Sequence, residues 1–160
     1  MKAASDADAV SFSTLIAAYG KARKFEKMEE LAEEATRGGV SLELPAYNAM
    51  IDAYGKAGLY HNMENGLARL REAGWTADMF TLNSMVHAYG MGNMLKCMED
   101  LVERQRKKGL PLDAWTYNIL IGAYGDLGMP YASVKVWGEE RRGMGWSVVR
   151  ADGIRTATHV

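Results

Sequence analysis

Side chains that could perform catalysis or hold a metal ion are few in this sequence and lie far apart. The three histidines, His61, His87 and His159, have no cysteine or acidic partner at the spacing of a metal site. The single cysteine, Cys97, has no histidine near it, which argues against a catalytic thiol and excludes a disulfide framework. No P-loop, dinucleotide-binding glycine motif or nucleophile elbow occurs. The sequence therefore predicts a protein that is not an enzyme and that uses no metal or cofactor.

The dominant pattern is an internal repeat of 35 residues. The tripeptide Ala-Tyr-Gly occurs four times at this interval, with its tyrosines at Tyr19, Tyr54, Tyr89 and Tyr124. Because glycine makes up only about 7% of average proteins, such a series of matches is improbable by chance. The chain therefore divides into four repeats, numbered one to four here, at residues 9–43, 44–78, 79–113 and 114–148. Residues 1–8 are interpreted as an N-terminal extension or added residues, and 149–160 as a tail or the start of a further repeat.

Each repeat has the pattern of two helices. Apolar residues recur at i, i+3, i+4 and i+7 in the first helix, as in Tyr47, Met50, Ile51 and Tyr54. Glycine or asparagine then marks a turn at 58, 93 and 128, and glycine ends the second helix at 39, 74 and 109. Second helices are expected to begin near Phe25, Tyr60, Met94 and Pro130. No strand pattern occurs, so we predict an all-α fold, an α-solenoid of eight helices in four stacked pairs with a right-handed superhelical trend.

The hydrophobic content of the sequence supports a folded chain, whereas its net charge does not favour nucleic-acid binding. Hydrophobic residues make up 48% of the 160 residues, which excludes a wholly disordered chain, and no apolar run is long enough for a membrane span. The first ten residues match neither a secretory signal nor a transit peptide, which fits a mature or trimmed form. The net charge of −1 argues against a nucleic-acid binder when charge alone is considered. The charge run at residues 26–30 is interpreted as an exposed face.

The repeats resemble the pentatricopeptide repeat. The resemblance rests on the period, on Thr-Tyr-Asn-Ile-Leu-Ile at 116–121, on Ala-Tyr-Gly-Lys-Ala-Gly at 53–58, and on the final residues Asp78 and Asp113. It covers about 140 of the 160 residues. The tetratricopeptide repeat has a period of about 34 and a Trp and Leu-Gly signature that is absent here. The resemblance implies sequence-specific binding of single-stranded RNA, mostly in plant organelles, with one base read by each repeat.

The resemblance also implies which side chains read a base: a polar residue early in the first helix and the last residue of the repeat. These residues are Ser13, Asn48, Asn83 and Asn118 in the first helices, and Glu43, Asp78 and Asp113 at the ends of repeats. An amide has both donors and an acceptor, so it can pair with the edge of an unstacked base. The alternative is that these residues cap helices, which suits Asp78 and Asp113 because a threonine follows three residues later.

In the family's pairing pattern, asparagine with aspartate reads uridine, so repeats two and three are expected to prefer uridine. Repeat one pairs serine with glutamate, which matches no pairing known to us. The last residue of repeat four is Val148, Val149 or Asp152, and its base choice stays open.

Two further sets of residues follow from the resemblance. The second residue of each repeat clamps a base in the family, and here this set is Val10, Pro45, Phe80 and Trp115. Phe80 and Trp115 depart from the usual valine and either stack on bases or pack on a protein. A lysine after Ala-Tyr-Gly contacts phosphate, and this position holds Lys21, Lys56, Met91 and Asp126. The loss of lysine in the last two repeats is evidence against a complete RNA-binding face.

We therefore predict a sequence-specific single-stranded RNA-binding protein in organellar RNA processing, stabilisation or group II intron splicing. The alternative is a protein-interaction scaffold of an organellar complex that reads no bases. The expected partners are single-stranded RNA, other RNA-processing proteins and a second copy of the chain, because four repeats alone give modest affinity. No membrane association is expected. The resemblance implies a plastid or mitochondrion, with the chloroplast slightly favoured.

Overall fold

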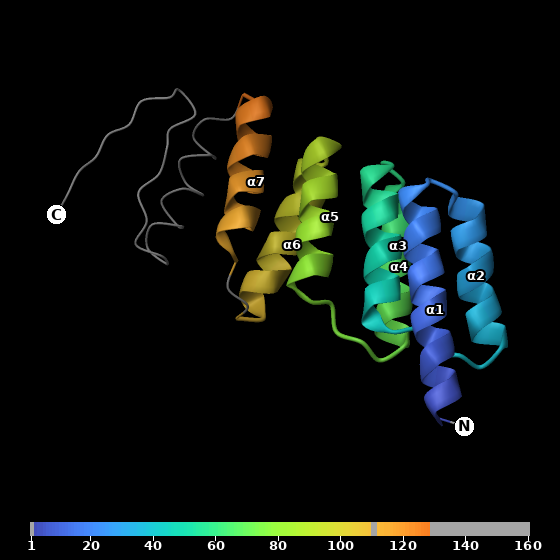
Figure 1. Cartoon of the computed structure of the whole chain (residues 1–160). Helices are drawn as coiled ribbons and strands as arrows, with labels where there is room; N and C mark the ends of the chain where they lie inside the picture. Colours follow the sequence, from blue (N-terminus) through green and yellow to red (C-terminus); the bar gives the residue numbers. More distant parts are fainter. Residues whose placement is uncertain (1, 110–111, 129–160) are drawn as a thin grey trace. The chain divides into compact units, whose positions relative to one another are not determined.

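The computed structural model describes residues 2–109 and 112–128, which form seven α-helices and, within those residues, no strand. The helices are α1 (Lys2–Lys21), α2 (Phe25–Arg37), α3 (Leu44–Lys56), α4 (Tyr60–Glu72), α5 (Met79–Met91), α6 (Leu95–Lys107) and α7 (Ala114–Asp126) (Figure 1). The predicted all-α repeat architecture is confirmed. The eighth helix, expected from Pro130, lies outside the described residues. None of the described helices is long and apolar enough to cross a membrane.

Helix boundaries follow the 35-residue period closely. The first helices α3, α5 and α7 each have 13 residues, whereas α1 has 20 because the N-terminal extension is helical from Lys2. Second helices begin at Phe25, Tyr60 and Leu95, within one residue of the expected positions. The periodic apolar pattern is a local property of the chain, which is why it places these boundaries so well.

The turn inside each repeat needs a left-handed backbone at one position. Gly58 and Gly128 take φ of 73° and 66° there, and Asn93 takes 55°. In repeat one the same position is Arg23, with φ of 56°. Asparagine tolerates this conformation, whereas an ordinary L-residue is strained in it by about 1–2 kcal/mol. The sequence pattern did not reveal Arg23 as a turn residue, because arginine carries no turn signal.

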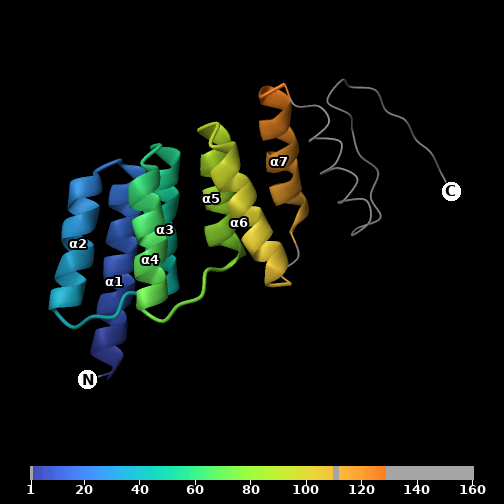
Figure 2. The ribbon, with the colours of Figure 1, turned by 180° about the vertical axis from the view of Figure 1, so that it is seen from behind.

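The described residues fall into two compact units that divide between Ala88 and Tyr89, inside α5. In the first unit, α1 packs against α2 and α3, and α3 packs against α4. Figures 1 and 2 view this unit from opposite sides, and both place α1 and α3 in one layer with α2 and α4 in a second layer. First helices therefore form one face of this unit and second helices form the other.

The glycine of Ala-Tyr-Gly allows the first helices to approach one another. A Cβ atom built on Gly55 would lie 2.8 Å from the Cβ of Ala88 in α5 and 3.1 Å from the Sδ of Met63 in α4. Real Cβ atoms essentially never lie 2.8 Å from another heavy atom of this kind, so a larger residue here would force a shift between α3 and α5. In the second unit a Cβ on Gly90 would lie at an ordinary 3.6 Å from the Sδ of Met98.

The tyrosine of the same tripeptide ties a first helix to the preceding second helix. The buried hydroxyl of Tyr54 donates to Glu29 Oε1 of α2, and Glu29 Oε2 accepts from Arg69 of α4 at 2.7 Å. Burial, together with the hydrogen bond to Glu29, holds the pKa of Tyr54 well above its usual value. In the second unit, Tyr124 donates to Glu99 of α6 at 2.6 Å. These carboxylates thus connect repeats.

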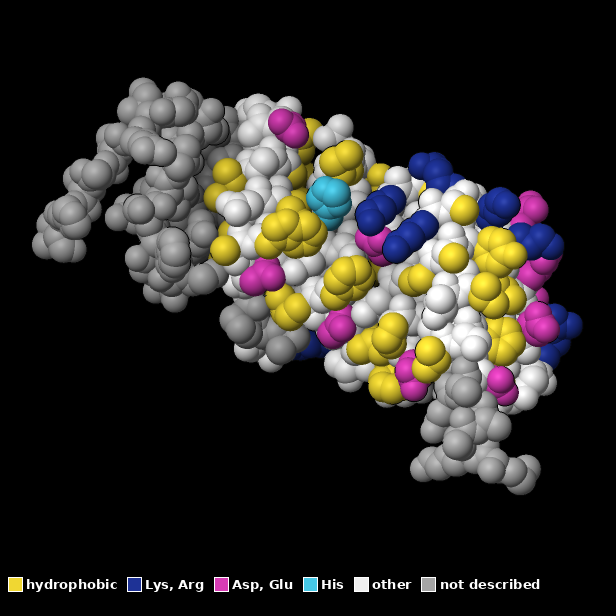
Figure 3. All heavy atoms as spheres, viewed as in Figure 1, with side chains coloured by type: hydrophobic (Ala, Val, Ile, Leu, Met, Phe, Trp, Pro, Cys, Tyr) yellow, Lys and Arg dark blue, Asp and Glu magenta, His cyan; other side chains and the backbone are white. Residues whose placement is uncertain are grey.

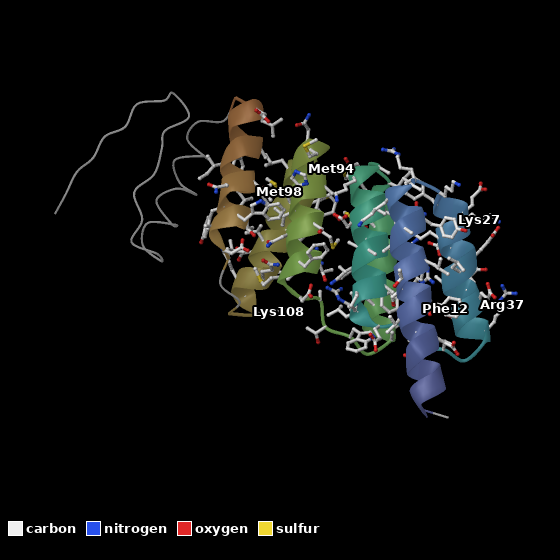
Figure 4. All side chains as sticks on the ribbon, in the orientation of Figure 1. Phe12, Lys27, Arg37, Met94, Met98 and Lys108 are labelled. Atoms are coloured by element: carbon white, nitrogen blue, oxygen red, sulfur yellow. The ribbon has the colours of Figure 1, made fainter. Side chains whose placement is uncertain are left out.

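The interpretation of residues 26–30 as nothing more than an exposed face is therefore wrong in part. Glu29 bonds to two neighbouring helices, and Met28 is fully buried. The remainder of α2 does carry a solvated surface: Lys27 pairs with Glu30 at 3.0 Å, and Lys27 and Arg37 project away from α1 (Figure 4). A pattern of charges cannot show which single carboxylate meets a buried hydroxyl from another helix.

Candidate nucleic-acid interface

The structure brings Asn48 and Asp78 together from positions 30 residues apart in sequence. Asn48 lies in the second turn of α3, and Asp78 immediately precedes α5. The Asn48 Nδ2 atom donates to the two carboxylate oxygens of Asp78 at 3.2 and 3.3 Å. Because α3 and α5 are adjacent first helices, the early polar residue of repeat two meets the last residue of the same repeat. This is the pair that the sequence resemblance singled out.

Thr81, which the sequence analysis did not name as a site residue, completes this cluster. Its hydroxyl lies 2.5 Å from Asn48 Oδ1 and 2.8 Å from Asp78 Oδ1, and its backbone N–H donates to Asp78 Oδ1 at 2.9 Å. Thr81 is fully buried in the first turn of α5. We call Asn48, Asp78 and Thr81 the repeat-two cluster. The spacing of Asp78 and Thr81 could have revealed the cap, but only the fold adds Asn48.

Both predicted aspartates also cap helices, as the alternative interpretation required. Asp113 is the N-cap of α7, and its Oδ1 accepts from the Thr116 N–H at 2.8 Å and from the Thr116 hydroxyl at 2.7 Å. Asp78 accepts the equivalent bonds from Thr81. An ionised carboxylate has about four acceptor sites, so a cap leaves capacity for a ligand. The side chain of Asp78 is also exposed, so capping and ligand binding are compatible there.

The electrostatics of the repeat-two cluster keep Asp78 ionised. Burial tends to raise the pKa of its carboxyl, but hydrogen bonds from the Thr81 N–H, the Thr81 hydroxyl and the Asn48 amide outweigh burial and lower the pKa below its ordinary value. An ionised carboxylate only accepts hydrogen bonds, so the Asn48 nitrogen, and not its oxygen, must face Asp78. The heavy-atom positions thereby determine the orientation of the amide.

Repeat one does not assemble such a cluster. The Ser13 hydroxyl donates to the backbone oxygen of Ala9 at 2.8 Å, within its own helix. Glu43 is exposed and makes no side-chain hydrogen bond to the start of α3. Ala46 stands where repeat three has Thr81, so it offers no hydroxyl. The two residues that the resemblance paired in repeat one are therefore not hydrogen-bonded to each other in the described residues.

The remaining predicted base readers lie in differing environments. Asn83 is buried in α5, whereas Asn118 is exposed on α7. The three candidates for the last residue of repeat four, Val148, Val149 and Asp152, lie outside the described residues.

The predicted base-clamping residues are all exposed. Val10 is 58% exposed, Phe80 55% and Trp115 50%, and Pro45 is exposed in the first turn of α3. Single exposed apolar side chains are ordinary on protein surfaces. Here, however, they recur at the same position of every repeat, which is the second residue of α3, α5 and α7 and lies inside α1 for Val10. The exposed parts of these side chains are apolar surface, the kind of surface on which a base can stack.

The two predicted phosphate-binding lysines differ in their partners. Lys21 is exposed at the end of α1, whereas Lys56 donates to Asp52 at 2.7 Å, one helical turn earlier on α3. Figure 3 shows Lys and Arg side chains gathered over the carboxyl-terminal ends of α1 and α3. Met91, at the equivalent position of α5, is 75% exposed and uncharged. The first-helix face of the first unit is therefore its basic side. The carboxylate of Asp52 partly neutralises the positive charge of Lys56 on this face.

The described residues contain no group of three His, Cys, Asp or Glu side chains that could hold a metal ion.

Stacked helical pairs with periodic polar residues on the first helices define a helical-repeat binding scaffold. A comparison of the sequence with protein families identifies the family to which this scaffold belongs. The family described as "PPR repeat" matches residues 10–40 and 45–75, and the "Pentatricopeptide repeat domain" matches residues 67–127. The chain belongs to the pentatricopeptide repeat family.

Solved structures agree with this assignment. The crystal structure of the pentatricopeptide repeat protein PPR10 from maize is similar, with a TM-score of 0.77 and 24% identity over 83% of this chain and 19% of that one. The structure of PPR10 in complex with an 18-nt psaJ RNA element is also similar, with a TM-score of 0.74 and 27% identity over 84% of this chain and 20% of that one. This chain thus spans about one-fifth of those proteins. A search of curated proteins gave no match.

Proposed function

We propose that this protein binds single-stranded RNA on its first helices, with repeat two reading one base through Asn48 and Asp78. The observation that carries this proposal is the repeat-two cluster, in which hydrogen bonds hold an amide and a carboxylate in place beside a basic, partly apolar face. The likeness to PPR10, whose structure contains an RNA element, supports it. Single strands are the suitable ligand, because only unpaired bases expose their edges to side chains.

The bonds within the cluster leave a defined capacity for a ligand. Asn48 uses one N–H toward Asp78 and one oxygen lone pair toward Thr81, so one N–H and one lone pair are unused. The residue is 8% exposed, so access is narrow and suits the edge of a base better than a bulky group. We propose uridine as the base preferred by repeat two, and by repeat three from the matching asparagine and aspartate in its sequence.

The proposed setting is RNA processing, stabilisation or group II intron splicing in a plastid or mitochondrion, with the chloroplast as the first choice. It rests on the family alone. If each repeat reads one base, the four predicted repeats offer about four base positions. Other RNA-processing proteins and a second copy of the chain are the partners that would extend this RNA site.

The test compares binding of short labelled oligouridine, oligocytidine and a duplex of matched length by fluorescence anisotropy. We expect oligouridine to bind most tightly and the duplex most weakly. Equal binding of all three nucleic acids would mean that only electrostatic contacts with the phosphate backbone contribute to affinity. That result would overturn base reading. An absence of saturable binding at about 100 μM protein, the weak limit of non-specific nucleic-acid affinities, would overturn RNA binding itself.

A second candidate function is a protein-interaction scaffold that uses the same face. The exposed Met91, together with Phe80 and Trp115, favours it, because apolar groups replace charge toward the later repeats. In that case Met91→Lys would weaken partner binding, whereas it would strengthen RNA binding by adding a phosphate contact. The sign of the change in RNA affinity therefore separates the two functions.

A further inference from the structure

We propose that Thr81 is a positioning residue that fixes the amide of Asn48 and thereby determines whether repeat two prefers uracil or cytosine. The proposal rests on the proposed function of RNA binding. It adds a third residue to the two that read the base, and this residue belongs to the following repeat.

The geometry gives Thr81 contact with both other members of the cluster. Its hydroxyl lies 2.5 Å from Asn48 Oδ1 and 2.8 Å from Asp78 Oδ1. Both of those atoms only accept hydrogen bonds, so the single hydroxyl proton is shared between them. Because Thr81 is fully buried, water does not compete for this proton. The hydroxyl is therefore held as a donor toward the Asn48 oxygen.

Asn48 is thus oriented from two sides. The carboxylate of Asp78 attracts the amide nitrogen, and the hydroxyl of Thr81 attracts the amide oxygen. A rotation of the amide by half a turn would place the oxygen against a carboxylate and the nitrogen 2.5 Å from a hydroxyl. The carboxylate disfavours that flip because it cannot donate to an oxygen, and the hydroxyl disfavours it because 2.5 Å is too short for an N–H···O hydrogen bond, so the two together lock the amide.

The orientation of this amide decides which pyrimidine it matches. On the Watson–Crick edge, uracil presents a carbonyl acceptor beside the N3–H donor. Cytosine presents an amino donor beside the N3 acceptor, so the order of the two groups is reversed. An amide that turns freely can form two hydrogen bonds with either base. An amide held in one orientation matches only one of them, and Asn48 retains the N–H and the lone pair that such a contact needs.

One bond of the helix cap does not depend on the Thr81 hydroxyl. The cap of α5 uses its backbone N–H, which donates to Asp78 at 2.9 Å. Any residue except proline retains that bond, so Thr81→Val removes the hydroxyl with its contacts to Asn48 and Asp78, while it keeps the backbone bond of the cap and the side-chain shape. Thr81→Ser keeps both the cap and the hydroxyl. Thr116→Val makes the same exchange one repeat later and is the matched control.

The experiment measures the affinity of each variant for an oligouridine in which single positions are changed in turn to cytidine. For the wild type we expect a loss of about tenfold at the repeat-two position, the size of one two-bond base contact. Thr81→Val should reduce this ratio to less than about threefold at that position only, and Thr81→Ser should restore it. Thr116→Val should leave that position unchanged. A folded Thr81→Val protein that keeps the full ratio would overturn the proposal, as would an equal loss at every position.

A gain of function in repeat one tests the same idea without changing Thr81. Ser13→Asn with Glu43→Asp installs the reading pair, and Ala46→Thr adds the hydroxyl. We expect one additional position that discriminates uridine from cytidine only when Ala46→Thr is present. Equal discrimination without Ala46→Thr would overturn the role of the threonine. If the wild type discriminates at no position, the proposed base reading fails instead, and this outcome is visible before any variant is measured.

Discussion

Repeats one and two have the same helical scaffold and different polar clusters. In repeat two, Asn48 and Asp78 are hydrogen-bonded and Thr81 orients the amide, whereas in repeat one Ser13 bonds to its own helix and Glu43 stays apart. Both repeats contain Ala-Tyr-Gly, and in both the glycine lies close to an alanine of the next first helix. The difference shows that the scaffold and the polar cluster are separable, because a repeat can have the same helical fold without the hydrogen-bonded cluster.

The largest expected effect concerns the scaffold and should be alike in both repeats. Gly55→Ala places a Cβ 2.8 Å from Ala88, and Gly20→Ala places one 3.0 Å from Ala53, so each should destabilise the fold by about 1–3 kcal/mol through overpacking. Gly90→Ala is the matched control. Its Cβ would meet neighbours at 3.4 Å or more, and helical alanine gains about 0.5–1 kcal/mol over glycine. Thermal unfolding followed by circular dichroism checks these signs, and a stabilised Gly55→Ala protein would contradict the close packing.

The next effect concerns the tyrosine that joins repeats. Tyr54→Phe removes the donor to Glu29 while Arg69 still pairs with that carboxylate, so we expect a loss of about 1 kcal/mol. Because the folded state raises the pKa of Tyr54, its stabilisation is complete below pH of about 10 and is lost as the pH rises. The wild type should therefore lose stability as the pH rises above about 10, and more steeply than Tyr54→Phe. Parallel melting curves with the same alkaline slope would contradict this.

A moderate effect should separate the two repeats by their caps. Asp78→Ala removes the N-cap of α5 and should cost about 1 kcal/mol at neutral pH, whereas Glu43→Ala should cost almost nothing because Glu43 makes no cap bond. The pKa of Asp78 is lowered in the folded state, so its stabilisation is present above pH of about 4 and is lost as the pH falls further. Denaturant unfolding of the two variants at pH values on either side of this range measures the contrast. Equal costs would show that the repeats do not differ at their caps.

The smallest effect concerns charge on the binding face. Asp52→Asn releases Lys56 from an exposed ion pair, a type of contact that contributes about 0.3–0.5 kcal/mol. We expect RNA affinity to rise about two- to threefold at low salt, with a steeper salt dependence by about 0.7 of a logarithmic unit for one added phosphate contact. In a Lys56→Ala background, Asp52→Asn should leave the salt slope unchanged. An unchanged slope in both backgrounds would show that Asp52 does not restrain Lys56.

Local pattern alone established the repeats of this protein. Apolar spacing predicted the helices, glycine predicted most turns, and the family resemblance pointed to Asn48 and Asp78, because each of these signals lies within one repeat. Arg23 was missed at its turn, since its left-handed backbone follows from the helices on either side and not from its own residue type.

Only the tertiary structure decided which polar groups meet. Thr81 contacts Asn48 across 33 residues, and Glu29 reaches Arg69 across 40. The close approach of Gly55 to Ala88 likewise depends on how α3 packs against α5. A hydrogen bond depends on direction and on distances of a few tenths of an ångström, and two helices acquire that precision only when their side chains pack against each other. The sequence by itself therefore determined the repeating scaffold, whereas packing between successive repeats determined the site.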